Sequence, residues 1–414
     1  MKSREVPDDR TDPTATIARV AEIRVVELPA AELLLRWQDV EVSGGYGSDL
    51  AIDPSDPDSF YLLSDRGPNF DTANADQKGF ALPEFTPRIG RFRARGDLLQ
   101  RVGVIEMRDA AGHPLTGLPH PPGPGSTGET AVTLAGQALP FDPMGIDPEG
   151  MAAMPDGSFW IADEYGPQLV HLDPGGRIRE RIGPWTVPRA LPAVLATRRP
   201  NRGLEALALL PDGATLAGIT QSSLDNPSAD VRGSSAVSRI LLFDTRSGSS
   251  RQYLYPQEAP GLSNSAICAL SEEVLLVIEH DARYPSDTRN PSTIQRVYRV
   301  ELRDATDVSD PENDSHGQRV EGRTLEQLSN DELIAAGIRT ATKELVLDLR
   351  ALGYPHNKPE GLALIGDRTL VILNDDDFGI ESDGRGGIVP KILPATGERD
   401  RNTLWFVTLS APLT

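Results

Sequence analysis

The sequence contains a single cysteine, Cys268, in 414 residues. One cysteine excludes an intrachain disulfide and any zinc site built from several cysteines. Because Cys268 lies in the apolar stretch AICAL, we expect it to pack within a strand and to be chemically inert.

Long apolar stretches are also missing. No run of about 18 apolar residues occurs, so the sequence predicts no membrane span. The first residues, MKSREVPDDRTDPTAT, lack the apolar core of a signal peptide. We expect residues 1–20 to be a disordered lead-in. The protein is then either cytoplasmic or exported with a signal peptide that precedes this sequence, and we favour a secreted or periplasmic location.

Basic residues are scarce relative to acidic ones. The chain has 41 Lys and Arg against 61 Asp and Glu, a formal charge of −20, which argues against a nucleic-acid partner. The 38 glycines and 35 prolines are typical of a turn-rich β protein. Part of the acidic excess lies in a repeated motif, which suggests cation binding.

The clearest copy of this motif is DPEGMAAMPDGSFWIADEYGP, residues 147–167. Two apolar runs separated by Pro-Asp-Gly predict two antiparallel strands joined by a tight turn. The start of the first strand and the end of the second then meet at one edge. Glu149 and Asp163, fourteen positions apart, would lie side by side. Solvated acids at strand ends would give the same local pattern.

Recurrence of the pattern along the chain makes chance an insufficient explanation. In each copy, 14 or 15 positions separate the polar residue before the first run from the one after the second. The five leading and closing pairs are Asp49 and Ser64, Glu149 and Asp163, Glu205 and Thr220, Ser265 and Glu279, and Glu360 and Asn374.

Two further strand-like runs usually follow each hairpin, which predicts sheets of four strands. Radial repetition of such sheets is a β-propeller. We favour five blades, the last completed by an N-terminal strand at Ala21–Pro29, with a sixth blade hidden in an insertion as the alternative. Residues 21–414 would form one domain, with loop insertions near 109–140 and 304–342.

In a propeller the first strand of each blade lines a central channel, so the repeated acids would converge there. Crowded carboxylates must either take up protons or bind a cation. Carboxylate oxygens without soft ligands suit Ca²⁺. The metal could be catalytic or could only hold the blades together. The predicted ligands are Asp49, Asp65, Glu149, Asp163, Glu205, Glu279, Glu360 and Asp375.

Basic residues adjoin these acids in the sequence. Arg66, Arg202 and Lys358 are candidates for binding an anionic substrate, although each could simply neutralise a neighbouring carboxylate. His280 is the best candidate for general acid or base catalysis, with a structural hydrogen bond as the alternative. Glu164 and Arg66 complete the predicted catalytic group.

The motifs DPEGMAAMPDGSFWIADEYGP, NRGLEALALLPDG, KPEGLAL and LLSDRGPN resemble the bacterial phytase-like family, described as having esterase-like activity of phytase. The resemblance runs from about Gly44 to the C-terminus. It implies a β-propeller, often exported, that hydrolyses ester or phosphoester bonds. Asn264-Ser265 departs from the pattern, since the other repeats carry an acid there.

The leading hypothesis is therefore a metal-dependent hydrolase of a small-molecule ester or phosphoester, acting as a monomer at the mouth of an acidic channel. A lactonase-like calcium hydrolase is the alternative among enzymes. A non-catalytic binding propeller with structural calcium is the alternative from another class.

Overall fold

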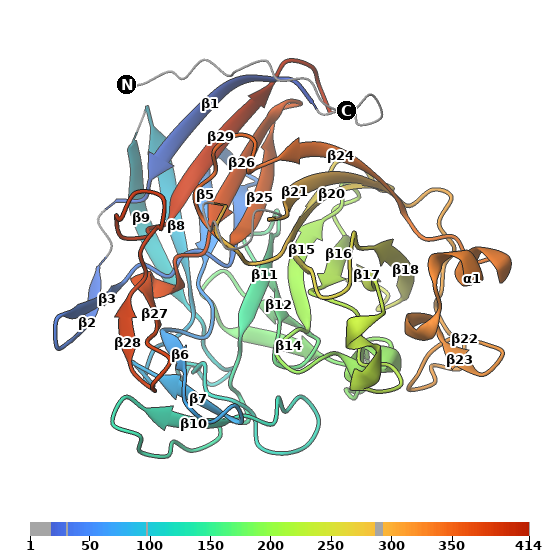
Figure 1. The fold of residues 1–414 in the computed structure, drawn as a ribbon, viewed down its shortest axis with the longest axis horizontal. Coiled ribbons are helices and arrows are strands. Elements are labelled where there is room, and N and C mark those ends of the chain that lie inside the picture. The colour runs from blue at the N-terminus through green and yellow to red at the C-terminus, as the bar shows by residue number, and fades with distance from the viewer. Residues whose placement is uncertain (1–17, 30–31, 97, 286–292, 414) are drawn as a thin grey trace.

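The computed structural model describes residues 18–29, 32–96, 98–285 and 293–413. The regular secondary structure of this part of the chain is almost entirely β, which confirms the all-β prediction. Five of its sheets have four strands each. Figure 1 shows them arranged around a common centre, with β1 in blue beside β29 in red at the top.

The five sheets mostly follow the order of the chain. The first sheet contains β4 (Asp49–Asp53), β5 (Asp56–Leu63), β8 (Arg88–Arg95) and β9 (Leu98–Glu106). The second contains β11 (Pro148–Ala153), β12 (Phe159–Asp163), β13 (Gln168–Leu172) and β14 (Ile178–Ile182). The third contains β15 (Leu204–Leu209), β16 (Thr215–Thr220), β17 (Val237–Asp244) and β18 (Ser250–Pro256). The fourth contains β19 (Ser263–Ala269), β20 (Val274–His280), β21 (Gln295–Glu301) and β24 (Thr342–Asp348). The fifth contains β25 (Pro359–Ile365), β26 (Thr369–Asn374), β29 (Thr403–Leu409) and β1 (Val20–Glu27).

The fifth sheet joins both ends of the described chain. β1 pairs antiparallel with β29, and Val25 lies opposite Trp405. The strand expected at Ala21–Pro29 thus begins one residue earlier and ends at Glu27. The lead-in expected at residues 1–20 falls mainly on residues 1–17, which lie outside the described residues.

The first strands of the five sheets contact one another in a closed sequence: β4 with β11, β11 with β15, β15 with β19, β19 with β25, and β25 with β4. We call these five the ring strands. Each pair of neighbouring sheets encloses its own hydrophobic cluster. Between the first and fifth sheets, for example, the rings of Phe60 and Phe406 meet edge to face with centroids 6.1 Å apart. Strands buried on both faces explain the continuous apolar runs, such as the fully buried β12.

Shorter elements lie in the connections between and within the sheets. They are β2 (Leu33–Trp37) with β3 (Val40–Ser43), β6 (Asn69–Asp71) with β7 (Gln77–Phe80) and β10 (Thr130–Thr133), β22 (Arg319–Val320) with β23 (Arg323–Thr324), and β27 (Ile380–Ser382) with β28 (Ile388–Pro390). The helices are η1 (Ala193–Thr197), η2 (Ala229–Gly233), η3 (Leu325–Gln327), η4 (Asp377–Gly379) and α1 (Asn330–Ala335). None of the described helices has the length and apolar character needed to cross a membrane. The predicted insertions contain β10 and the segment from β22 to α1.

Cys268 lies in β19, where burial raises the pKa of its thiol to about 12. The thiol therefore stays protonated at neutral pH, as expected of a packing residue.

Candidate metal and substrate site

The ring strand β11 contains a β-bulge at Glu149. Pro148 pairs with Asp163 and Gly150 pairs with Ala162, so the register slips by one residue between them. A bulged residue has no partner opposite it, and the bulge changes the direction of its side chain. The backbone of β11 therefore sets the direction of the Glu149 side chain.

The same bulge recurs in three other ring strands. In β15 and β25 the slip falls at Glu205 and Glu360, and in β19 it falls at Ser265. The four positions are thus structurally equivalent, and three of them carry a glutamate. Ser265 instead donates a hydrogen bond to the carbonyl of Pro359, 2.5 Å away, which ties the fourth sheet to the fifth.

The glycine that follows two of these glutamates allows close approach of the ring strands. A Cβ atom on Gly150 would lie 2.6 Å from the backbone of Ala206 and Leu207, closer than packing allows. On Gly361 it would lie 2.9 Å from the Cβ of Leu373 and 3.0 Å from Leu50. The Glu-Gly pair in the repeat thus combines a directed carboxylate with tight contact between strands.

The three glutamates influence one another and their acidic neighbours. The pKa of Glu149 is raised well above its usual value by burial, and then by Asp147, Glu205, Glu164 and Glu360. Burial likewise raises the pKa of Glu205 to about 7, although Gln221, Arg202 and Lys358 oppose the rise. Carboxyl groups that perturb one another in this way share one small volume.

The remaining predicted acids of this group behave similarly. Burial, followed by Glu205 and Asp147, raises the pKa of Glu164. Burial, followed by Asp375 and Asp147, raises that of Asp65. The structure therefore brings together much of the predicted set, and one further acid, Asp147, lies with it. We call these residues the acidic cluster: Asp65, Asp147, Glu149, Glu164, Glu205, Glu360 and Asp375.

Asp147 was not among the predicted ligands, although it stands two residues before Glu149 in the motif. Asp65, Asp147 and Glu149 each offer an oxygen within 4.8 Å of the others. Asp147 Oδ2 and Glu205 Oε2 are buried and have no hydrogen-bond partner in the structure. Buried carboxylate oxygens without donors fit a hard cation, and Ca²⁺ takes six to eight oxygens. The residues of the acidic cluster therefore fit the predicted metal.

Arg66 occupies one side of the acidic cluster. Its backbone N–H donates to Asp147 Oδ1 at 3.1 Å, and its Nε lies 3.4 Å from Asp147 Oδ2. Its Nη1 lies 3.5 Å from Glu129 Oε2. Only 8% of Arg66 is exposed, so the guanidinium mainly neutralises and orients these carboxylates.

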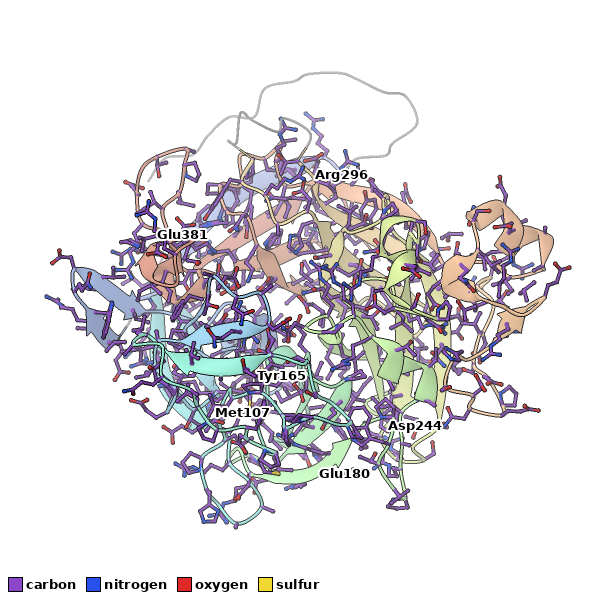
Figure 2. All side chains as sticks on the ribbon, turned by 60° about the horizontal axis from the view of Figure 1, so that its bottom comes forward. Met107, Tyr165, Glu180, Asp244, Arg296 and Glu381 are labelled. Atoms are coloured by element: carbon purple, nitrogen blue, oxygen red, sulfur yellow. The ribbon has the colours of Figure 1, made fainter. Side chains whose placement is uncertain are left out.

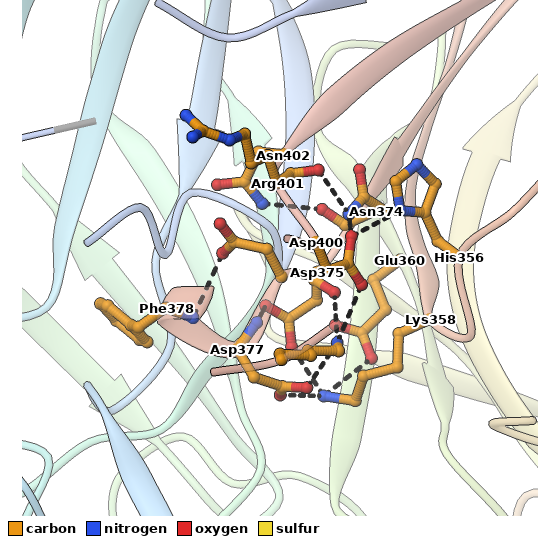
Figure 3. Close-up of polar contacts among 12 residues, drawn as sticks. His356, Lys358, Glu360, Asn374, Asp375, Asp377, Phe378, Asp400, Arg401 and Asn402 are labelled. Carbon is orange, nitrogen blue, oxygen red and sulfur yellow. Dashed lines mark hydrogen bonds and ion pairs between the residues drawn. The ribbon is translucent and has the colours of Figure 1, made fainter. Parts of the chain in front are cut away.

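Two lysines occupy another side, and Figure 3 shows one of them, Lys358, beside Asp375 and Asp377. Lys358 Nζ lies 2.6 Å from Asp375 Oδ2, 2.9 Å from Asp377 Oδ1 and 3.5 Å from Glu360 Oε1. Lys391 Nζ lies 2.6 Å from Asp377 Oδ2. Burial would raise the pKa of Asp377, but the two lysines outweigh it and hold the pKa below its usual range.

His280 does not fit the acid–base role expected for it. Burial, then Lys358 and Arg202, lower the pKa of its imidazole to about 3, so the ring is neutral at physiological pH. Its Nδ1 accepts the backbone N–H of Ala282 at 3.0 Å, which places the ring hydrogen on Nε2. That Nε2 is buried and has no hydrogen-bond partner in the structure. His280 is thus a neutral donor beside two cations.

Glu279 lies away from the acidic cluster, because successive side chains of a strand point to opposite faces. Its Oε2 accepts hydrogen bonds from Tyr255 and Lys343, both at 2.7 Å, and its Oε1 accepts from the backbone of Glu258. These partners include the outer strands β18 and β24, so the carboxylate joins the outer parts of two sheets and is not available to a central metal.

Asp49 and Asp163 also have structural contacts. β4 has no bulge at Asp49, which pairs with Leu63, and Asp49 Oδ2 accepts the backbone N–H of Met151 at 2.6 Å. This contact fastens β4 to β11. Asp163 Oδ1 accepts the backbone N–H of Asp147 at 3.0 Å, and this hydrogen bond holds the backbone of Asp147 in place. Asp49 is thus not placed as a ligand by its contacts, whereas Asp163 Oδ2 is buried and has no hydrogen-bond partner among the described residues, like Asp147 Oδ2.

Arg202 is the most available predicted cation. Its Nη1 donates to Ser263 Oγ at 3.1 Å, and its charge lowers the pKa of Glu164, Glu205 and His280. Arg202, Lys358 and His280 therefore present donors beside the acidic cluster.

Sequence comparison relates this chain to a protein family and to a secreted protein. Residues 42–378 match the family described as Phytase-like, esterase-like activity of phytase. The chain belongs to the phytase-like family. An uncharacterized secreted protein of Arthroderma benhamiae is 28% identical over 190 residues, covering 38% of this chain and 37% of that protein. The match thus spans well under half the length of either protein.

Solved structures resemble this phytase-like chain only remotely. Virginiamycin B lyase from Staphylococcus aureus covers 91% of this chain and 83% of its own, with 12% identity and a TM-score of 0.33. A gluconolactonase from Xanthomonas campestris covers 94% and 98%, with 10% identity and a TM-score of 0.32. Likeness at this level says nothing about activity.

Proposed function

We propose that this protein is a calcium-dependent hydrolase of ester or phosphoester bonds whose site is the acidic cluster. The observation that carries the proposal is the bulge repeated at Glu149, Glu205 and Glu360, with Glu205 and Glu360 close enough to raise the pKa of Glu149. Burying carboxylates close together destabilises the folded protein. A bound ligand of opposite charge is the simplest reason for the arrangement.

The proposal includes the architecture. We propose that the five four-stranded sheets are the blades of a five-bladed propeller, that β1 closes its ring, and that residues 21–414 form one domain. The contacts of the ring strands support this arrangement. No sixth four-stranded sheet occurs among the described residues, which favours five blades over six.

The side chains have separable roles in this proposal. Oxygens of Asp65, Asp147, Glu149 and Glu205 would hold the cation, which when bound would polarise a phosphoryl or carbonyl oxygen. Arg202, Lys358 and the Nε2–H of His280 would bind and orient the anionic part of the substrate. Glu164, whose pKa is raised, would hold or release a proton during attack by water. Arg66 would hold the Asp147 carboxylate in place through its backbone N–H and Nε.

Two alternatives use the same cluster. A lactonase-like hydrolase would polarise a lactone carbonyl in the same way. A binding propeller would use calcium only to join its blades. We favour the hydrolase because Arg202 and the Nε2–H of His280 present donors beside the acidic cluster, which a purely structural metal would not require. We also propose a monomer located outside the cell, in keeping with the secreted relative from Arthroderma benhamiae.

A substrate panel separates these possibilities. The purified protein is assayed with p-nitrophenyl phosphate, p-nitrophenyl acetate and a δ-lactone, each with EGTA and after calcium is restored. We expect turnover of a phosphomonoester or carboxylic ester that EGTA abolishes and calcium restores. Turnover of the lactone alone would favour the lactonase. If EGTA lowers the melting temperature but no substrate turns over, the binding propeller is correct.

A further inference from the structure

A second cavity lies apart from the acidic cluster, where β1, β8 and β9 meet residues 399–402. Its volume is about 820 Å³, within the range of small-molecule sites. No member of the acidic cluster lines it. β1, β8 and β9 lie together on the left of Figure 1, at the junction of the first and fifth sheets.

One wall of this cavity is apolar. Tyr46, Phe92 and Leu99 belong to the hydrophobic cluster between the first and fifth sheets and also line the cavity. The Tyr46 and Phe92 rings meet edge to face at 5.4 Å. Leu98, which is 72% exposed, extends the apolar wall toward solvent. This wall suits a hydrocarbon or aromatic group.

The polar end is defined by the Tyr46 hydroxyl. Tyr46 is only 7% exposed, and its Oη forms no hydrogen bond of ordinary geometry with the described residues. Burial raises the pKa of this hydroxyl, and the nearby Arg88 and Arg101 oppose the rise. A hollow of about 20 Å³ shares Tyr46 and Arg101 with the large cavity and is also lined by Arg88 and Ser64. This hollow has room for a single water-sized group. A ligand oxygen here would meet the hydroxyl and two guanidinium groups, in place of the Glu32 carboxylate that also lines the hollow.

The charges around the cavity favour an anion. Each of the four acidic residues that line it has a partner. Glu27 pairs with Arg401 at 3.4 Å, and Glu41 lies 3.9 Å from Arg399. Asp376 accepts the backbone N–H groups of Gly45 and Phe378, and Asp400 contacts His356 at 2.6 Å. Arg101 forms a surface ion pair with Glu32 at 3.3 Å, in which both side chains are about a third or more exposed, and it also lies near the Tyr46 hydroxyl. Such an exposed pair contributes little and is readily exchanged for another anion.

We propose that this cavity binds a small monocarboxylate with an apolar tail. The carboxylate would accept hydrogen bonds from the Tyr46 hydroxyl and the Arg101 guanidinium, while the tail would lie along Phe92, Leu99 and Leu98. The inference stands on contacts that are independent of the proposed hydrolase.

Calorimetric titration with octanoate, butanoate and octanol tests the proposal. We expect octanoate to bind more tightly than butanoate by about fourfold for each added methylene, as burial of a hydrocarbon chain predicts. Octanol lacks the negative charge, so its dissociation constant should be at least about tenfold larger than that of octanoate. Octanol binding as tight as octanoate binding would overturn the proposal.

Two variants locate the carboxylate. Arg101→Gln and Tyr46→Phe should each weaken octanoate binding by about tenfold and leave octanol binding within about twofold. Arg303→Gln is the matched control, because Arg303 also forms a surface ion pair, with Glu273 at 3.0 Å, and does not line the cavity. No binding of octanoate, or equal binding by the Arg101→Gln and Arg303→Gln proteins, would refute the assignment.

Discussion

Glu149 and Glu205 occupy the same place in neighbouring ring strands: each is the residue at which the strand register slips, and each lacks a partner on the strand opposite. Within the acidic cluster, the Glu205 carboxyl group is one of the causes that raise the pKa of Glu149. A backbone irregularity repeated in successive sheets thus creates a local concentration of charge that none of the sheets could create alone.

Close approach of β11 and β15 depends on Gly150. A methyl group there would lie 2.6 Å from the backbone of Ala206, so Gly150→Ala should lower the free energy of unfolding by about 2 kcal/mol or more. Gly103→Ala is the control, since its new Cβ would meet nothing nearer than Arg91 Cβ at 4.0 Å. We expect that change to stay within about 0.5 kcal/mol by urea denaturation. Equal losses would contradict the packing account.

Lys391 should be important for stability because it is buried between Asp377 and Asp400, 2.6 and 3.6 Å away. Lys391→Met removes the charge but keeps most of the volume, and should cost about 3 to 5 kcal/mol, as expected when a buried ion pair loses one member. Lys78→Met removes a lysine paired with the exposed Asp71 and should cost less than about 1 kcal/mol. Similar costs for both, measured by urea denaturation, would show that the buried pairs contribute little.

Calcium binding should strengthen as pH rises from 5 to 8. The pKa of Glu205 is raised from 4.5 to about 7 and those of other cluster acids are raised as well, so the metal must displace protons below neutrality. Without metal, the folded protein holds more protons than the unfolded one. The contribution of these groups to the free energy of unfolding therefore falls as pH increases through this range.

The measurement is the melting temperature in EGTA and in excess calcium at each pH. The calcium-induced rise should be larger at pH 8 than at pH 5. The lowered pKa of buried histidines such as His280 has the opposite effect on stability. This effect is present with and without calcium, so it cancels in the difference between the two melting temperatures. A calcium effect that is constant, or that shrinks with rising pH, would contradict the account.

Much of the fold could be predicted because each sheet repeats one local pattern. Two apolar runs around a turn specify a hairpin, and both faces of these strands are buried, so the runs are easy to recognise. The equivalence of Glu149, Glu205 and Glu360 was also visible, since all three open their repeats. Their bulges were not visible, because a register slip depends on the opposite strand.

The errors in the site have a related cause. Asp49 matches the spacing but is followed by Leu50 and not by glycine, and its strand has no bulge there. Glu279 and His280 are adjacent, and spacing alone could not decide which of them faces the centre. Lys391 lies in a connection far from any repeat, so no sequence signal pointed to it.

The most direct test of the account is calorimetric titration of calcium into the wild-type, Glu205→Gln and Asp49→Asn proteins. Both variants replace a buried acid of a ring strand by its amide, and circular dichroism verifies that each is folded. Only Glu205 stands at a bulge, so Glu205→Gln should weaken calcium binding by about tenfold or more, since the charge of the ligands sets the affinity of such sites. Asp49→Asn should stay within about twofold of wild type, because Asp49 accepts the N–H groups of Leu50 and Met151. Equal calcium affinity in wild type and Glu205→Gln would contradict the central claim that the bulged glutamates form a metal site.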